Sequence, residues 1–159
     1  MQKWIILIIV ALIAIIGIFI VFNVKIETEY IPESEVEESE MRNTIVSLYF
    51  FEKETGEVIE ENRLVDSKEL LKNPYKVLIE MLIKGPENEY YEKTIADNTN
   101  LIDVSFEKGM VTLNFSKEFI ENIEKEEIQK NKIVILKTLT QLTEVTDVKI
   151  MVEGVDIEI

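Results

Sequence analysis

The longest hydrophobic stretch of the chain runs from Trp4 to Phe22, and Gly17 is its only residue outside the apolar set. As a helix at ~1.5 Å per residue, the stretch would be about 28 Å long, close to the ~30 Å hydrocarbon thickness of a bilayer. No charged residue interrupts it. The pattern predicts a single transmembrane helix within residues 1–25. The residues expected to contact lipid include Trp4, Ile5, Leu7, Leu12, Gly17, Phe19 and Phe22.

The residues around this stretch favour its retention as an anchor. A cleaved signal peptide has a shorter apolar region followed by small residues, which Asn23, Val24 and Lys25 do not supply. The chain has no cysteine for lipid attachment. Lys3 precedes the helix and Lys25 follows it, so charge orients it only weakly, but a long carboxy-terminal domain can cross the membrane. We expect a single-pass cell-membrane protein with its carboxy-terminal domain on the extracytoplasmic side.

Residues 26–41 have the composition of an acidic linker. They contain seven glutamates, Pro32 and no basic residue, and such a segment buries too little apolar surface to fold alone. Repulsion between the glutamates favours an extended chain. At ~3.3 Å per residue, the linker could hold the following domain up to about 50 Å from the anchor.

Residues 42–159 have the length of one ordinary domain. The pattern of apolar and polar residues predicts that this domain begins with a β-hairpin. In residues 44–51, Val46, Leu48 and Phe50 alternate with residues of the opposite face, as in a half-buried strand. Thr55 and Gly56 indicate a turn. Residues 58–65 then predict a second strand, which is partly exposed because charged residues interrupt it.

Two helices are predicted next. Asp66 can cap a short helical turn, and Asn73 before Pro74 is typical of the start of a longer helix. Gly85 and Pro86 end that helix. The apolar spacing predicts a buried face made of Tyr75, Leu78, Ile79 and Leu82. Residues 87–100 are expected to form a loop or short helix, and their Asx residues favour turns over a calcium site because the glycine of an EF-hand loop is missing.

Residues 101–115 predict a hairpin with Lys108 and Gly109 as its turn. Lysine is not the preferred residue for a turn with positive φ at both positions, but the apolar register outweighs this. The predicted cross-strand pairs are Phe106 with Val111, Val104 with Leu113, and Ile102 with Phe115. Ser116 can then cap a helix that carries Glu118 in its first turn.

The last third of the chain predicts an amphipathic helical region and two final strands. The helical periodicity begins at Phe119 and reaches Leu142, with a break suggested near residues 130–132. Alternating residues on either side of Gly154 predict the strands. We therefore expect an α+β domain, with a mixed sheet built largely from hairpins and two main helices on one sheet face.

Composition removes several kinds of chemistry. The chain has no histidine and no cysteine, which excludes Ser-His-Asp and Cys-His nucleophile systems and ordinary zinc sites. Its only tryptophan is Trp4 in the predicted anchor. Residues 42–159 hold fifteen basic and twenty-four acidic residues, a net charge of −9, which argues against nucleic acid as a partner. No cofactor or metal site is predicted.

Four sequence blocks in this order resemble the GerM domain family. They are LYFFEKETGEVIEENRLV from Leu48, LIEMLIKGPEN from Leu78, GMVTLNFSKEF from Gly109, and TLTQLTEVTDVKIMVEG from Thr138. The resemblance implies a fold like that of ring-building-motif modules, and a role in sporulation or spore germination. The motif positions Gly85, Pro86, Gly109, Phe115, Ser116, Phe119 and Gly154 are given structural roles. Many members of the family are attached to the membrane through a lipidated cysteine. This chain has no cysteine and departs from the family in its predicted anchor.

The resemblance also implies a non-enzymatic binding or assembly module in the cell envelope. The expected partners are the bilayer, through residues 4–22, and either another envelope protein or further copies of the chain. An alternative is a module that binds peptidoglycan or another glycan. Glycoside hydrolysis by paired carboxylates is a further alternative, and the lack of a tryptophan in residues 42–159 disfavours it.

Overall fold

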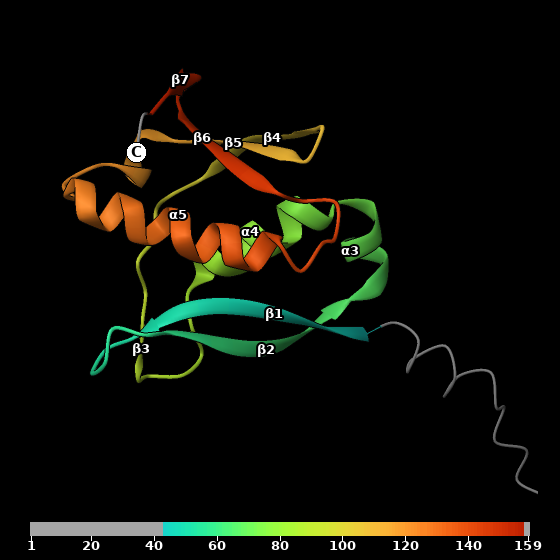
Figure 1. Ribbon diagram of the computed structural model, residues 1–159, viewed down its shortest axis with the longest axis horizontal. Coiled ribbons are helices and arrows are strands. Elements are labelled where there is room, and N and C mark those ends of the chain that lie inside the picture. Colours follow the sequence, from blue (N-terminus) through green and yellow to red (C-terminus); the bar gives the residue numbers. More distant parts are fainter. Residues whose placement is uncertain (1–42, 158–159) are drawn as a thin grey trace, which may run out of the picture. The chain divides into compact units, whose positions relative to one another are not determined.

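The computed structural model describes residues 43–157, which are drawn as coloured elements in Figure 1. The predicted anchor at residues 4–22 and the acidic linker at residues 26–41 lie outside the described residues. Within the described range, no helix has the length and apolar content needed to cross a bilayer. The transmembrane helix therefore stays a prediction from the sequence.

The described chain alternates hairpins with helices. In order, its elements are β1 (Asn43–Glu52), β2 (Val58–Asp66), α3 (Ser67–Lys72), α4 (Pro74–Lys84), β3 (Tyr91–Glu92), β4 (Leu101–Glu107), β5 (Met110–Phe115), the 3₁₀ turn η1 (Lys117–Phe119), α5 (Lys125–Leu139), β6 (Asp147–Val152) and β7 (Val155–Asp156).

The strands form two sheets, where the sequence predicted one. The first sheet has the order β2-β1-β3, and the second has the order β4-β5-β6-β7 with β5 and β6 parallel. Figure 1 shows α4 and α5 between the two sheets, and α5 contacts both β1 and β6. The α+β class is confirmed. Placing both helices on one face of one sheet was wrong, because alternation identifies the buried face of a strand but not its neighbours.

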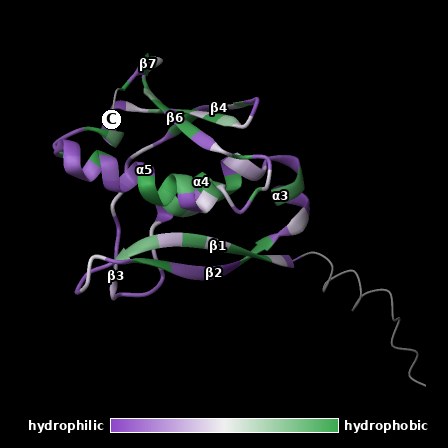
Figure 2. Ribbon diagram, viewed as in Figure 1, coloured by the Kyte–Doolittle hydropathy of each residue, from purple (hydrophilic) through white to green (hydrophobic). Residues whose placement is uncertain are grey.

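One cluster of apolar side chains joins these layers. Val46, Leu48 and Phe50 of β1 are buried, as their alternation predicted. Phe115 and Phe119 stack with their ring centroids 4.3 Å apart. Figure 2 shows hydrophobic residues along α4 and a hydrophilic middle section of β2. The cluster also contains Leu78, Ile79, Leu82, Val111, Leu113, Ile135, Leu139, Val148 and Ile150.

The β4–β5 hairpin has the predicted turn, with Lys108 and Gly109 both at positive φ. Two of the three predicted pairs are present, Phe106 with Val111 and Val104 with Leu113. The third was wrong, because Leu101 lies opposite Phe115 and the register shifts just after it. Ile102 falls in this irregularity and is 51 % exposed. A local bulge of this kind leaves no clear mark in the alternation pattern.

The helix boundaries follow most of the predicted signals. Pro74 begins α4, and Gly85 follows it with a φ of 88°. Asp66 caps α3 by accepting from two backbone N–H groups. Ser116 stands before η1 but makes no capping bond, and its hydroxyl accepts from the N–H of Asn100 at 3.0 Å instead. Its predicted capping role was therefore wrong.

α5 is continuous through residues 130–132, where the sequence suggested a break. The interruption lies earlier, at Asn122, whose φ of 61° separates η1 from the helix. A reciprocal capping box between Glu124 and Glu127 then starts α5. Residues 87–100 form a loop that contains the short strand β3, and β3 pairs with the end of β1.

Gly109 is expected to be less replaceable than Gly56, although both have positive φ. Alanine at either position incurs a left-handed strain of roughly 1–2 kcal/mol. At Gly109 the new Cβ would also lie 2.6 Å from Oγ1 of Thr146, where crowding adds about 1–3 kcal/mol. Urea unfolding of the two alanine variants measures this difference. Equal destabilisation by Gly109→Ala and Gly56→Ala would contradict it, because no atom approaches Gly56.

Candidate binding groove

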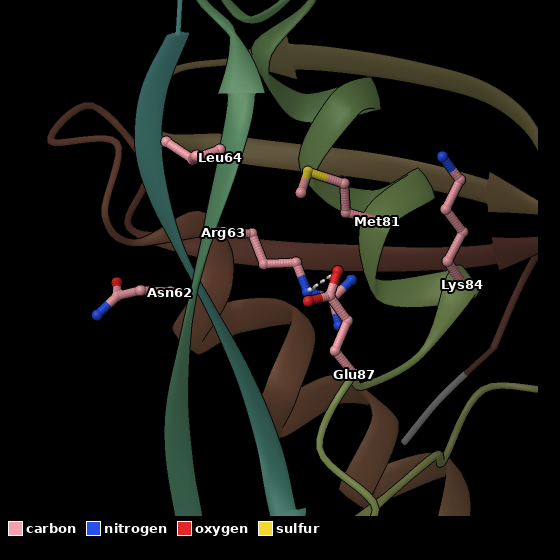
Figure 3. Close-up of a pocket in the computed structure, with 6 residues that line it drawn as sticks. All are labelled: Asn62, Arg63, Leu64, Met81, Lys84 and Glu87. Carbon is pink, nitrogen blue, oxygen red and sulfur yellow. Dashed lines mark ion pairs between the residues drawn. The ribbon is translucent and has the colours of Figure 1, made fainter.

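A surface groove runs between β2 and α4. Its largest depression has a volume of about 450 Å³, and smaller depressions extend it toward α3. Figure 3 shows Arg63 extending from β2 toward Glu87, with Met81 and Lys84 presented by α4. The lining residues of the largest depression are Asn62, Arg63, Leu64, Met81, Lys84 and Glu87.

A network of charged side chains ties β2 to the loop after α4. The Arg63 side chain, only 9 % exposed, forms an ion pair with Glu61. Its Nη2 donates to the carbonyl oxygen of Gly85 at 2.7 Å, and its Nε lies 3.5 Å from Oε1 of Glu87. The Glu61 carboxylate accepts from the backbone N–H groups of Glu87 at 3.2 Å and Asn88 at 3.1 Å. The bonds of both side chains are thus satisfied within the domain.

Burial and hydrogen bonding act in opposite directions on the pKa of the Glu61 carboxyl group. Burial by itself raises the pKa of the Glu61 carboxyl. The N–H groups of Glu87 and Asn88 and the guanidinium of Arg63 outweigh burial, and they hold that pKa below its ordinary value. Glu61 is therefore an ionised acceptor at neutral pH. A carboxyl held in this way is poorly suited to act as a general acid, which needs a raised pKa.

The two edges of the β1–β2 hairpin differ. The side-chain amide of Gln141 bonds both backbone groups of Ser47, with Oε1 accepting at 3.1 Å and Nε2 donating at 2.8 Å. Oγ1 of Thr138 accepts from the N–H of Tyr49 at 3.2 Å. Thr138 near the end of α5 and Gln141 just after the helix thus cover part of the outer edge of β1. Among residues 43–157, β2 pairs with β1 alone, and the groove lies beside β2.

The sequence matches the family described as Germane, sporulation and spore germination, over residues 47–158. This chain belongs to the Germane family. The resemblance to GerM domains is thereby confirmed.

Solved structures of Germane domains are similar to this chain. The first GerMN domain of the sporulation protein GerM from Bacillus subtilis is 25 % identical, with a TM-score of 0.60 over 72 % of this chain and 86 % of that one. The tandem GerMN domains of the same protein give 23 % identity and a TM-score of 0.56, over 72 % of this chain and 41 % of theirs. Among curated proteins, none matches the chain.

The Germane motif positions do not converge on one site. Gly85 is joined to the groove network through its carbonyl group, and Pro86 follows it. The remaining positions are Gly109 and Gly154 in hairpin turns, and Phe115, Ser116 and Phe119 at the junction of β5 with η1. Glu61 and Arg63 were missed, because in the sequence they only interrupt a strand. Their spacing of two residues could have revealed them, since it places opposite charges on one strand face.

The groove of this Germane domain combines a strand edge with apolar and charged side chains. The described residues include no group of three or more acidic side chains placed to hold a metal ion. The groove instead combines the edge of β2 with the apolar Met81 and Leu64, and with the charged Lys84 and Glu87. An extended peptide uses such features together, because it pairs its backbone and places alternate side chains in a groove.

Replacement of Glu61 by glutamine is expected to destabilise the domain by about 1–3 kcal/mol at pH 7, because it removes a charge that accepts from Nε and Nη2 of Arg63 and from the backbone N–H groups of Glu87 and Asn88. The folded-state pKa of Glu61 lies below the free value of 4.5, so its contribution is complete above pH 4.5 and is lost as the pH falls toward the folded-state pKa. The wild type should therefore lose more stability than Glu61→Gln in this acid range.

Unfolding by urea at several pH values measures this effect. Glu54→Gln is the matched control, since Glu54 is exposed in the β1–β2 turn. A parallel loss of stability in the wild type and in Glu61→Gln below pH 4.5 would show that Glu61 is not held ionised by its partners.

Proposed function

We propose that this chain is a membrane-anchored docking module of the cell envelope that acts in sporulation or spore germination, without catalysis. The observation that carries the proposal is the groove beside β2. The side chains of Glu61 and Arg63 are bonded within the domain, whereas no strand of residues 43–157 lies beside the open edge of β2. A surface of this kind offers backbone groups to another protein.

Membership of the Germane family supports the link to sporulation or germination. The proposed location rests on the sequence. The apolar residues 4–22 would hold the chain in the cell membrane as a single pass, and the linker at residues 26–41 would separate the membrane from the extracytoplasmic domain. Tethering of this sort raises the effective concentration of neighbours in the same membrane, so a docking surface of modest affinity suffices.

The absence of catalysis is part of the proposal and has its own support. Glycoside hydrolysis needs one carboxyl group with a raised pKa. In the groove, the partners of Glu61 lower its pKa, and Glu61 already accepts from two backbone N–H groups. The network is better suited to hold the walls of a docking surface at a constant distance.

Photo-cross-linking in intact cells tests the proposal. A photoreactive residue in place of Leu64, which is 69 % exposed beside the groove, is expected to give a discrete protein adduct. Ser105 is the matched control position, because it is exposed on β4 away from the groove. Equal labelling from both positions, or no protein adduct from Leu64, would overturn docking. Firm retention of the chain on purified peptidoglycan would then favour glycan binding.

A further inference from the structure

The open edge of β2 presents a defined set of backbone groups. The backbone groups of Ser47 and Tyr49 point away from β2 and bond the side chains of Gln141 and Thr138. Alternate residues of an antiparallel strand direct their backbone groups to opposite edges, so the neighbours of these two residues bond β2. Those neighbours lie opposite Glu61 and Arg63. The backbone groups at the open edge therefore belong to Glu60, Asn62 and Leu64.

This edge is long and regular. β2 has nine residues, contains no proline or glycine, and pairs with β1 without a register shift. Natural edge strands are usually interrupted or covered, because unpaired edges recruit other chains. One edge of β1 is covered by Thr138 and Gln141, and the pairing of β4, one edge strand of the second sheet, is irregular near Ile102. On β2 the remaining protection is charge, carried by Glu60, Glu61 and Arg63.

The face of β2 that carries Glu61 and Arg63 is complementary to itself when read antiparallel. If Asn62 lies opposite Asn62 of a second copy, the inner face pairs apolar with apolar and acid with base. On this face the pairs are Ile59 with Val65, and Glu61 with Arg63, each occurring twice by symmetry. A shift of the register by two residues would place Glu61 against Glu61 or Arg63 against Arg63, and like charges directly opposite destabilise a strand pair.

We propose that β2 of one copy pairs antiparallel with β2 of a second copy, with the two-fold axis at Asn62. This inference rests on the proposed docking function and names its partner as the same chain. Backbone groups of Glu60, Asn62 and Leu64 form the ladder. The edge charges select the partner, because they repel a strand that lacks the same order of charges and match one that has it.

The net charge of the domain sets the conditions for pairing. Residues 42–159 carry a net charge of −9, so two copies repel each other at low ionic strength. Glu61 and Arg63 keep their bonds within each copy and are nearly buried, so their attraction to the opposite strand is screened less by salt than this long-range repulsion. The pairing should therefore strengthen as salt rises, and common anchorage in one membrane should favour it further.

Disulfide trapping tests the register, since the natural chain has no cysteine. Opposite residues of a hydrogen-bonded antiparallel pair have Cα atoms ~5.5 Å apart, within the range of a disulfide. In the full chain in detergent, Asn62→Cys should form a covalent dimer on mild oxidation. Glu60→Cys and Leu64→Cys should each stay monomeric alone, because like positions would be about 13 Å apart, and should cross-link when mixed.

The trapping experiment has a built-in control for random collision. Ser105→Cys is exposed on β4 and should cross-link only at the background rate. A monomeric Asn62→Cys, or equal dimer yields from Asn62→Cys and Ser105→Cys, would overturn the proposal. If the photoreactive residue at position 64 still captures a different protein in cells, docking stands and self-pairing alone fails. If it captures none, docking fails as well.

A proline variant tests the backbone ladder directly. The N–H of Asn62 faces away from β1, so Asn62→Pro removes a bond to the second copy while leaving the β1–β2 bonds in place. Two ladder bonds are lost by symmetry, so the dimer affinity measured by sedimentation should fall by roughly tenfold or more. Asn62→Ala is the matched control, because it removes the side-chain bond to Ser47 but keeps the N–H. Equal affinities of the two variants would contradict the ladder.

Discussion

The parallel pairing of β5 and β6 is the constraint on which most of this architecture depends. Parallel neighbours cannot be joined by a tight turn, so the chain must cross from one end of the sheet to the other. α5 makes this crossing, and it passes between the two sheets. Its position lets Gln141 and Thr138 cover the edge of β1. The one strand of that hairpin left with a bare edge is then β2.

The Glu61–Arg63 ion pair fixes the position of the loop beside the open edge of β2. Both side chains are nearly buried, and removal of one partner would leave the other charge without compensation. Their bonds to Gly85, Glu87 and Asn88 hold the loop after α4 against β2. The family motif at Gly85 and Pro86 therefore has a second consequence besides ending a helix. It shapes one end of the groove.

These features agree with a module that works by contact. Charged groups that are fully engaged inside a domain stabilise its shape, whereas unpaired backbone groups at a strand edge are available to a partner. The Germane domain described here combines the two within one groove. Its acidity favours selectivity over strong association, because a net charge of −9 keeps copies apart unless the contact surfaces match.

The features that the sequence predicts correctly are mostly local. Pro74 and Gly85 marked the ends of α4, and alternation identified Val46, Leu48 and Phe50 as buried. It also predicted the turn at Gly109. Proline, glycine and the period of a strand act through the backbone of their own segment, so these features can be read without knowing the fold.

The groove could not be read in the same way. Glu61 looks like an ordinary exposed carboxylate until the loop at Glu87 and Asn88 is brought against it. The bulge at Ile102 and the separation into two sheets likewise depend on which strands become neighbours. The amino-acid sequence by itself determined the family, the ends of α4, the buried face of β1 and the turn at Gly109. Only the tertiary structure decided which strand edge is covered and which is open, because that depends on contacts between residues as distant as Ser47 and Gln141.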